Sequence, residues 1–524
     1  MPALLRGPQP ATSRGAGLLE VLLARAASDD PWLVFHHGKK SEPFTWRAAV
    51  GLAQGWAAAF AAAGVKDGAR VALLLPNGPD FVGAFFGAQL IGATPVPMPW
   101  PVAEAGIPKL PAGAEAVLAV AEVSAIAAPK GLEGVAVPVV SGPIAGEVAT
   151  VASSAPAFIQ FTSGSTGTPR GAVIPRSAAL ASASAMVEGL KLGPADVGVS
   201  WLPLFHDMGL VGVLMSSLVA GMRVHMMRPA ELLLHPWRWL ELCSEVKATL
   251  TVAPNFGYEL LLRRGKGPAG LDLSALRAML NGSEPVLRRT LDAFEDRYAP
   301  AGLKKGSILP VYGLAENTLG VTFQALGAPD PDLSIHDRSV PSAGQPIAGM
   351  EVAVRRPDGT LAEEGEEGEI TVGGPAVMSG YFRNEEATAK ALRNGALWTG
   401  DRGVIKGGRL YITGREKELI IKAGRKYHPA DIERIVGAVA DSPANGVAAF
   451  SVVSEQAGGE QLVVVVELRR QPTDDVTQRI RGKLAEELGV TADRIELVGA
   501  GDLPRTTSGK LKRSECIARY GSRA

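Results

Sequence analysis

One short segment of the sequence gathers residues that suit anion binding. Between Thr162 and Gly171 the chain has five hydroxyl side chains and three glycines. Glycine lets backbone N–H groups turn toward an anion, and hydroxyls add further donors. The segment lacks the GxxxxGK pattern of a Walker loop. It can wrap a polyphosphate, although its composition alone is also typical of a polar surface turn.

Four other segments place chemically useful side chains beside glycine or near the end of the chain. Each has an ordinary alternative when taken alone. His206 could be a structural histidine bonded to Asp207, Glu316 a surface carboxylate, and Lys510 a solvated charge. The segments are Trp201–Leu210, Asn281–Pro285 with Val311–Glu316, Trp398–Asp401 followed by Gly414 and Arg415, and Leu503–Arg513.

Strand-like and helix-like segments alternate along most of the chain and would position these residues. The apolar run Val71–Leu75, the helical pattern of Asp80–Ile91 and the extended run Thr94–Met98 form one βαβ unit. The pattern recurs near Leu250–Leu262. Such units imply a mainly parallel sheet, so we expect an α/β fold.

The last hundred residues or so have a different pattern. Gly446–Val453 and Gln461–Leu468 are expected strands, Asp474–Leu488 is an expected helix closed by Gly489, and Ile495–Val498 is a possible third strand. We therefore expect a large N-terminal domain, residues 1–413, built of several subdomains with mainly parallel sheets. A small mobile α+β domain, residues 414–524, should follow it.

Composition excludes several classes of protein. The 524 residues are 46% hydrophobic and 20% charged, as in an ordinary globular protein. Lysine plus arginine and aspartate plus glutamate both total 53, which argues against nucleic-acid binding. Cys243 and Cys516 form no CxxC pair, so neither a zinc site nor a disulfide framework is suggested. No signal-peptide core or membrane-span pattern is present, and we expect a cytoplasmic protein.

Taken together, the five segments resemble, in order and at suitable spacing, the motifs of the adenylate-forming superfamily. That family includes acyl-CoA synthetases, fatty acyl-AMP ligases, peptide-synthetase adenylation domains and luciferases. The resemblance extends from about Phe44 to Arg513. It implies an enzyme that uses ATP and Mg²⁺ to convert a carboxylic acid into an acyl-adenylate.

The resemblance implies a nucleotide site. Tyr312 and Gly313 would face adenine on one side, Asp401 would accept hydrogen bonds from the ribose, and Glu316 with Thr162 would bind Mg²⁺. Arg170 stands where the family usually has lysine. The full set of expected nucleotide-binding residues is Thr162, Ser163, Gly164, Ser165, Thr166, Gly167, Arg170, Gly282, Ser283, Glu284, Tyr312, Gly313, Asp401 and Arg415.

The resemblance also implies a catalytic group and an acyl pocket. Lys510 matches the family's catalytic lysine, Lys417 its hinge residue, and His206 and Arg415 complete the expected catalytic set. No side chain is expected to become covalently modified. The acyl pocket is expected to include Asp207, Met208, Gly209, Gly212, Asn255 and Phe256.

Three strings are most similar to fatty acyl-AMP ligases, namely Trp201–Leu210, Ala253–Leu260 and Gly424–Glu433. The region Thr322–Ala343, where those ligases generally have an insertion, is short, as in acyl-CoA synthetases. The acceptor of the acyl group therefore stays open between coenzyme A and the pantetheine of a carrier protein. The substrate should be a fatty or aryl acid. A catalytically inactive relative that binds a nucleotide or acyl group is the alternative.

Overall fold

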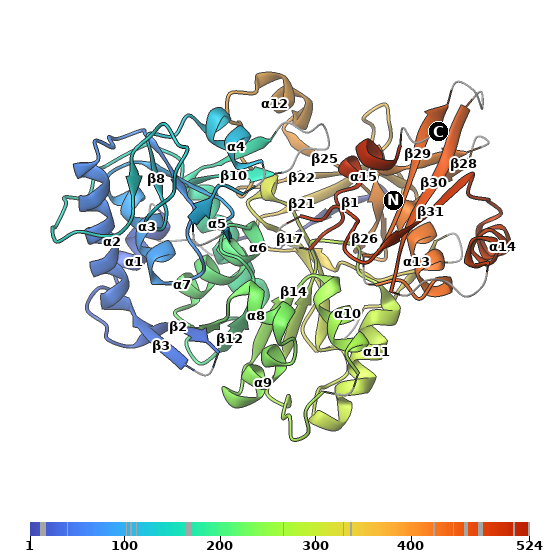
Figure 1. Cartoon of the computed structure of the whole chain (residues 1–524), viewed down its shortest axis with the longest axis horizontal. Helices are drawn as coiled ribbons and strands as arrows, with labels where there is room; N and C mark the ends of the chain where they lie inside the picture. Colours follow the sequence, from blue (N-terminus) through green and yellow to red (C-terminus); the bar gives the residue numbers. More distant parts are fainter. Residues whose placement is uncertain are drawn as a thin grey trace.

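The computed structural model describes residues 1–10, 17–38, 40–100, 102–104, 107–111, 113–162, 169–265, 267–327, 330–335, 338–422, 425–443, 445–454, 459–469, 475–506 and 509–521. The chain forms a large body followed by a smaller C-terminal layer, drawn in orange and red in Figure 1. Among the helices described, none combines the length and apolar character needed to cross a bilayer.

A nine-stranded sheet is the centre of the large body. Six neighbouring strands, β16 to β2 in sheet order, run parallel, and β17, β20 and β3 add antiparallel edges. In sheet order the strands are β20 (Gln345–Pro346), β17 (Gly320–Phe323), β16 (Ile308–Gly313), β15 (Ala278–Asn281), β14 (Leu250–Ala253), β12 (Val197–Ser200), β13 (Arg223–Met226), β2 (Pro31–His37) and β3 (Lys40–Thr45).

A second sheet contains the predicted βαβ unit. Its four strands, β5 (Thr94–Pro97), β4 (Arg70–Leu73), β8 (Ala125–Ala127) and β9 (Val139–Val140), are all parallel. Helix α3 (Pro79–Leu90) connects β4 to β5, and its residues from Phe81 to Leu90 are all buried. One of its faces packs against α2 (Trp46–Ala62). Helix α4 (Ala114–Ala121) lies between β7 (Ile107–Lys109) and β8 in the chain, and a short helix, α1 (Leu18–Leu23), precedes β2.

Two larger antiparallel sheets and two antiparallel strand pairs complete the described part of the large body, the pairs being β6 (Val102–Glu104) with β7 and β18 (Leu333–Ile335) with β19 (Arg338–Val340). A three-stranded sheet consists of β10 (Phe158–Thr162), β11 (Arg170–Ile174) and β23 (Gly380–Tyr381). The six-stranded sheet consists of β1 (Leu4–Arg6), β21 (Glu351–Arg355), β22 (Glu367–Gly373), β25 (Ala396–Lys406), β24 (Leu392–Arg393) and β26 (Arg409–Arg415). The glycine- and hydroxyl-rich segment is therefore the connection between β10 and β11, as its flanking apolar runs predict, but residues 163–168 lie outside the described residues.

Most of the remaining helices of the large body pack around the nine-stranded sheet, whereas α12 (Glu385–Ala391) contacts β23, β24 and β25. A continuous helical stretch begins with α6 (Asp207–Gly209), passes through a π-helical segment η1 (Leu210–Met215) and ends with α7 (Ser216–Ala220). The others are α5 (Arg176–Gly189), α8 (Pro229–Leu234), α9 (Arg238–Glu245), α10 (Asn255–Arg263) and α11 (Arg288–Tyr298).

The C-terminal layer has its own core. Strands β29 (Val447–Ser454), β30 (Gly459–Leu468) and β31 (Arg494–Gly499) form its sheet, with β31 parallel to β30. Helix α14 (Val476–Leu488) buries Val476, Ile480 and Leu484, leaves Leu488 half-buried and ends at left-handed Gly489. Helices α13 (Pro429–Val439) and α15 (Arg513–Tyr520) and the hairpin β27 (Ile420–Lys422) with β28 (Arg425–Tyr427) complete the layer.

The α/β fold class predicted from the sequence is confirmed. The buried apolar clusters of the C-terminal layer contain no residue before Ile420 among the described residues, and β26 of the large body continues to Arg415. We therefore propose that the domain boundary lies within residues 416–419, slightly later than the expected position at Gly414. The layer is called the lid below and comprises the described residues from 416 onward.

Candidate active site

The site forms where the parallel strands of the nine-stranded sheet end. Carboxyl ends of neighbouring parallel strands meet at one edge, so segments distant in sequence come together there. The chain leaves β12 toward His206, β15 toward Ser283 and β16 at Gly313. Three of the predicted motifs are therefore brought together by sheet topology.

Asp401 is the centre of a hydrogen-bonded group. Its Oδ2 accepts a 2.8 Å bond from the Tyr312 hydroxyl, and its Oδ1 accepts a 2.8 Å bond from Nε of Arg415. Asp401 and Arg415 are opposite each other in the hairpin of β25 and β26, which explains why these two residues, distant in sequence, are in contact. Each carboxylate oxygen has two acceptor positions. The buried Asp401 carboxylate can therefore bind two more donors, as two vicinal hydroxyls require.

Neighbouring charges fix the protonation of this group. Burial, and secondarily the Asp401 charge, raise the pKa of Tyr312 well above its ordinary value, so its hydroxyl remains a neutral donor. Asp401 also raises the pKa of the Arg415 guanidinium. The group thus presents a flat ring, a carboxylate and a permanent cation on one side of the site.

Lys510 reaches the same site from the lid. Its ammonium donates a 2.5 Å hydrogen bond to Oγ of Ser283. The loop before it is tightly folded, because Gly509 has a φ of +82° and Lys510 N–H bonds the Thr506 hydroxyl at 3.0 Å. Arg505 anchors this loop to the buried Glu467 of β30 at 2.6 Å. The lysine predicted to be catalytic is therefore held at the β15 end of the sheet by contacts of the described residues on both sides of it.

Burial and charge act in opposite directions on Lys510. Burial lowers the pKa of its ammonium, whereas the Asp207 and Glu284 carboxylates raise it and Arg415 lowers it. Burial raises the pKa of Asp207, and Lys510 opposes this effect. The site therefore contains a partly desolvated cation next to two carboxylates.

His206 is uncharged in this environment. Burial, followed by the positive charge of Lys510, lowers the pKa of His206 to about 3. Its ring lies beside that of Phe205, with centroids 4.7 Å apart. A neutral imidazole has one donor and one acceptor nitrogen, so His206 can orient a carboxylate without adding a charge.

The described residues predicted to face the phosphates lie where β10, β11 and β23 meet. Thr162 and Arg170 are Cα partners at the end of the β10–β11 pair where the connecting segment joins the two strands. The guanidinium of Arg170 lies over the Tyr381 ring, 5.6 Å from its centroid, and the Tyr381 hydroxyl donates a 2.7 Å bond to Oε1 of Glu316. Residues Ser163, Gly164, Ser165, Thr166 and Gly167 lie outside the described residues.

These residues suit Mg²⁺ bound mainly by phosphate. Mg²⁺ prefers hard oxygen ligands and is commonly held by one or two protein groups plus substrate phosphates. Glu316 and Thr162 supply a carboxylate and a hydroxyl. Within the described parts of the chain, no cluster of three or more histidine, cysteine or acidic residues could hold a metal unaided. The donor set therefore fits an ion that arrives with the nucleotide.

Gly282, Gly313 and Ser283 have backbone reasons for their identity. A Cβ on Gly282 would lie 2.6 Å from Val311, and one on Gly313 would lie 2.3 Å from the Leu319 carbonyl oxygen. Ser283 adopts a φ of +72°, a left-handed conformation that is costly outside glycine and is often found at functional sites. Close backbone packing within the protein thus accounts for both glycines.

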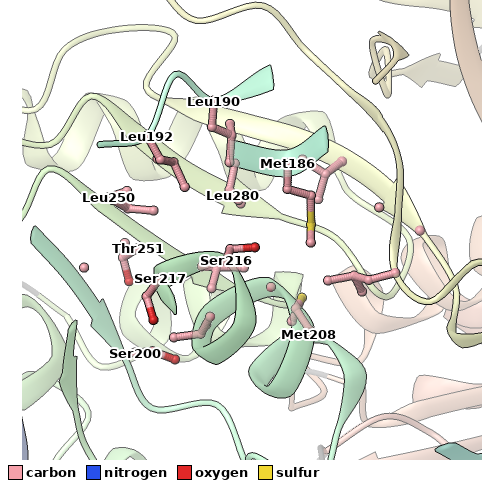
Figure 2. A pocket seen from close by; sticks show the side chains of 18 of the residues that line it. Met186, Leu190, Leu192, Ser200, Met208, Ser216, Ser217, Leu250, Thr251 and Leu280 are labelled. Atoms are coloured by element: carbon pink, nitrogen blue, oxygen red, sulfur yellow. The ribbon is translucent and has the colours of Figure 1, made fainter. Parts of the chain in front are cut away.

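An apolar cavity opens beside these residues. It extends along β12 and β14 from Ser283 and Tyr312 toward Leu250 and is covered by η1. In Figure 2, Met186 and Met208 lie on one side and Leu192 and Leu250 on the other. Side chains and backbone of β12, β13, β14, α5 and η1 supply most of the lining: Met186, Leu190, Leu192, Gly198, Val199, Ser200, Asp207, Met208, Gly212, Val213, Ser216, Ser217, Met222, Val224, Leu250, Thr251 and Val252.

Only some of the residues predicted to form the acyl pocket line this cavity. Asp207, Met208 and Gly212 line the cavity, and Gly209 packs under the Pro203 carbonyl, where a Cβ would lie 2.2 Å away. Asn255 and Phe256 are not among the lining residues. The side chain of Asn255 accepts a 3.2 Å bond from Asn281, and the Phe256 ring packs edge-on against Trp201.

A match to a family model assigns the chain to a family. Residues 23–382 match the model of AMP-binding enzymes. The chain belongs to the AMP-binding enzyme family. A putative acyl-CoA synthetase of Caulobacter vibrioides is 35% identical over 500 residues, covering 88% of this chain and 87% of that protein. The medium-chain fatty acid–acyl-carrier-protein ligase JamA of Moorena producens is 32% identical, covering 86% and 85%.

A solved structure of a relative supports the same assignment. The fatty acyl-adenylate ligase from L. pneumophila, in complex with acyl adenylate and pyrophosphate, superimposes with a TM-score of 0.73 at 28% identity and covers 97% of each chain. The resemblance inferred from the sequence motifs is thus confirmed at the level of the family and the fold.

Sequence reasoning missed most of the cavity of this AMP-binding enzyme. Met186, Leu190 and Leu192 belong to α5 and the turn after it, which no motif marked. Gly198 offered one signal, because a glycine inside a strand often marks a close approach by a ligand or another backbone. The remaining lining residues are mainly apolar residues of strands and of the α6–η1–α7 stretch, with a few hydroxyl side chains, and only the fold distinguishes them from the core.

The depressed pKa of His206 should make the enzyme less stable in acid. Because the folded value, about 3, is below the unfolded value of about 6.5, stability is fully present above pH 6.5 and is lost as pH falls. Between about pH 7.5 and 5.5 this histidine should cost about 1 kcal/mol of unfolding free energy. Urea unfolding of wild type and His206→Gln at both pH values measures it. An equal loss in both proteins would contradict the prediction.

Proposed function

We propose that this AMP-binding enzyme activates an aliphatic carboxylic acid with ATP, releasing pyrophosphate and forming an acyl-adenylate. One observation supports this most strongly. Lys510 of the lid, the Asp401–Arg415–Tyr312 group and the mouth of an apolar cavity lie together at one edge of the nine-stranded sheet. A nucleotide and an acyl chain can therefore meet there. This arrangement favours an active enzyme over an inactive binding relative.

The reaction requires two anions to approach each other. An oxygen of the substrate carboxylate forms a bond to the α-phosphorus of ATP, and the bond from that phosphorus to the bridging oxygen breaks. The electron pair leaves with pyrophosphate. Positioning and charge neutralisation then account for most of the catalysis. Lys510 and Arg415 supply fixed positive charge, and neutral His206 orients the attacking carboxylate.

The nucleotide is held by groups from both sides of the site. Asp401 binds the ribose, Tyr312 and Gly313 lie along adenine, and Arg170 faces the phosphates. Gly282 and Ser283 supply the opposite wall. Mg²⁺, held by Glu316 and Thr162 together with the phosphates, would neutralise charge on the departing pyrophosphate.

The cavity favours a fatty acid of medium length. Its hydroxyl groups are already used inside the protein: Ser216 bonds the Val211 carbonyl and Thr251 bonds the Val199 carbonyl. The three residues of β14 that line the cavity, Leu250 to Val252, span about 10 Å at the rise of a strand. An extended chain of about eight carbons, advancing roughly 1.3 Å per carbon given a bond of about 1.5 Å, has the same length.

Gly198→Val should shorten the acids that the enzyme accepts. A Cβ at Gly198 would already lie 3.2 Å from Met222 and Val224, so further methyl groups must enter the cavity. Each excluded methylene should cost about 0.8 kcal/mol, or roughly four-fold in catalytic efficiency. Acid-dependent ATP–pyrophosphate exchange over a series of straight-chain acids measures this. Gly198→Ala should show a weaker trend, and an equal loss for every acid would contradict the prediction.

The second half-reaction is transfer to a pantetheine thiol. The thiol sulfur attacks the acyl carbonyl, and AMP leaves with the electron pair of the broken carbon–oxygen bond. Lys417 is exposed in the turn η4 (Glu416–Glu418) that connects the large body to the lid, which suits a hinge. Rotation there would remove Lys510 and admit the thiol. The Moorena producens relative, named as a ligase of a fatty acid to acyl-carrier protein, favours a carrier protein over coenzyme A as the acceptor.

A product analysis tests the proposal. The enzyme would be incubated with ATP, Mg²⁺ and a panel of fatty and aryl acids, alone, with coenzyme A, and with a phosphopantetheinylated carrier protein. Mass spectrometry should detect acyl-AMP from medium-chain acids without an acceptor and acyl-carrier protein when the carrier is present. Acyl-CoA as the better product would identify coenzyme A as the acceptor. Absence of acyl-AMP with every acid would contradict the proposed function.

A further inference from the structure

Both oxygens of the Glu284 carboxylate have partners within the protein, although its position in the sequence motif predicts nucleotide binding. Its Oε1 accepts a 2.5 Å hydrogen bond from the backbone N–H of Phe256, in the first turn of α10. Its Oε2 lies 3.4 Å from the amide nitrogen of Asn445, which belongs to the lid. One carboxylate therefore connects the large body to the lid.

The same contact extends to the loop of the catalytic lysine. The amide nitrogen of Asn445 is also 3.4 Å from the carbonyl oxygen of Gly509, the residue before Lys510. Gly509 packs on the Phe256 ring so closely that a Cβ would lie 3.2 Å from Cζ. Glu284, Asn445 and Phe256 thus fix the position of the loop from which Lys510 enters the site.

Charge gives Glu284 a second effect on Lys510. The ammonium faces two carboxylates, Asp207 and Glu284, and one cation, Arg415, while neutral His206 lies nearby. Burial alone favours the uncharged amine. Burial raises the pKa of Glu284, whereas the Phe256 N–H, the Lys510 charge and Asn445 lower it. The ionised Glu284 carboxylate favours the charged ammonium, so its removal leaves Asp207 as the remaining carboxylate acting on Lys510, and the pKa of Lys510 should fall.

We infer that Glu284 is a positioning residue for adenylation, which fastens the lid to the start of α10 and keeps Lys510 protonated. The inference rests on the proposed function. Glu284 acts through Lys510 and forms no bond to the reacting atoms. Because the contact exists only while the lid is docked with Lys510 in the site, it should matter for acyl-adenylate formation and not for the later transfer to a thiol.

Two variants separate the two effects. Glu284→Gln keeps the shape and an acceptor but removes the charge. Asn445→Gly removes the amide bridge, and because Asn445 has a φ of +53°, glycine adopts the same backbone without strain. Glu386→Gln, which removes an exposed carboxylate paired with Lys390 on α12, is the matched control.

The test measures both half-reactions. ATP–pyrophosphate exchange would be followed between about pH 6 and about pH 10, which brackets the range in which a buried lysine titrates. Transfer to a thiol would be measured from chemically prepared acyl-adenylate. Glu284→Gln should slow exchange about ten-fold, the effect of one lost charge-assisted hydrogen bond, and move the alkaline midpoint to lower pH.

The remaining outcomes are also decisive. Asn445→Gly should slow exchange without moving the midpoint, and both variants should transfer prepared acyl-adenylate at the wild-type rate. An unchanged midpoint in Glu284→Gln, or equal losses in both half-reactions, would overturn the inference. If Glu284→Gln fails to fold, unaltered exchange by Asn445→Gly overturns it instead. A wild-type enzyme without acid-dependent exchange would contradict the proposed function itself.

Discussion

Lys510→Ala should slow acyl-adenylate formation by a factor of at least about 10², which corresponds to about 3 kcal/mol of transition-state stabilisation. The ammonium is the charged group that the lid brings to Ser283, 2.5 Å away. Negative charge that builds on the α-phosphate and on departing pyrophosphate would lose this partner. The loss should appear in the turnover number of ATP–pyrophosphate exchange more than in the Michaelis constant of the acid.

Lys512→Ala is the matched control for this variant. Lys512 lies two residues further along the same loop, but its ammonium pairs with Glu515 at 2.7 Å and not with the site. It should leave exchange near the wild-type rate. Lys510→Ala should also retain transfer of a chemically prepared acyl-adenylate to the thiol, because that step takes place after the lysine has left. Near-normal exchange by Lys510→Ala would remove Lys510 from the chemistry.

Asp401→Ala should raise the Michaelis constant for ATP by about 10² or more. On the proposed placement of the ribose, two hydrogen bonds from its hydroxyls to the carboxylate would be lost, each contributing about 1.5–3 kcal/mol. The same change leaves the Tyr312 hydroxyl and Arg415 without their common acceptor. We therefore also expect the free energy of unfolding to fall by about 1–3 kcal/mol.

Exchange kinetics and urea unfolding together test this second prediction. Asp401→Asn keeps the shape of the side chain and removes only the charge, so it should recover part of the stability but little of the affinity for ATP. Asp296→Ala, an exposed carboxylate on α11, is the control for loss of an aspartate. A normal Michaelis constant for ATP in Asp401→Ala would contradict the placement of the ribose.

Parallel sheet topology explains why so much of the fold was predictable. The βαβ unit of β4, α3 and β5 follows from local periodicity. Asp401 and Arg415 come into contact because β25 and β26 form an antiparallel hairpin in which the two residues are opposite each other. Motif order then implies one site, because parallel strands end at one edge. Both predictions depend on short-range patterns that a sequence records directly.

Side-chain partners across the two domains could not be predicted in this way. Glu284 stands in a nucleotide motif, but its carboxylate is used by Phe256 N–H and Asn445, which lies 161 residues later. Phe256 and Asn255 were expected in the acyl pocket, whereas one packs on the lid loop and the other on Asn281. The cavity itself is lined by apolar residues that local periodicity cannot distinguish from core. These features depend on how separate elements pack.

The fate of the carboxylate oxygen tests the central claim most directly. The enzyme would be supplied with ATP, Mg²⁺, a medium-chain acid labelled with oxygen-18 in its carboxylate, and a thiol acceptor. Attack on the α-phosphorus predicts that one labelled oxygen appears in AMP and that pyrophosphate remains unlabelled. Label in inorganic phosphate together with formation of ADP would show attack on the γ-phosphorus and would contradict the account.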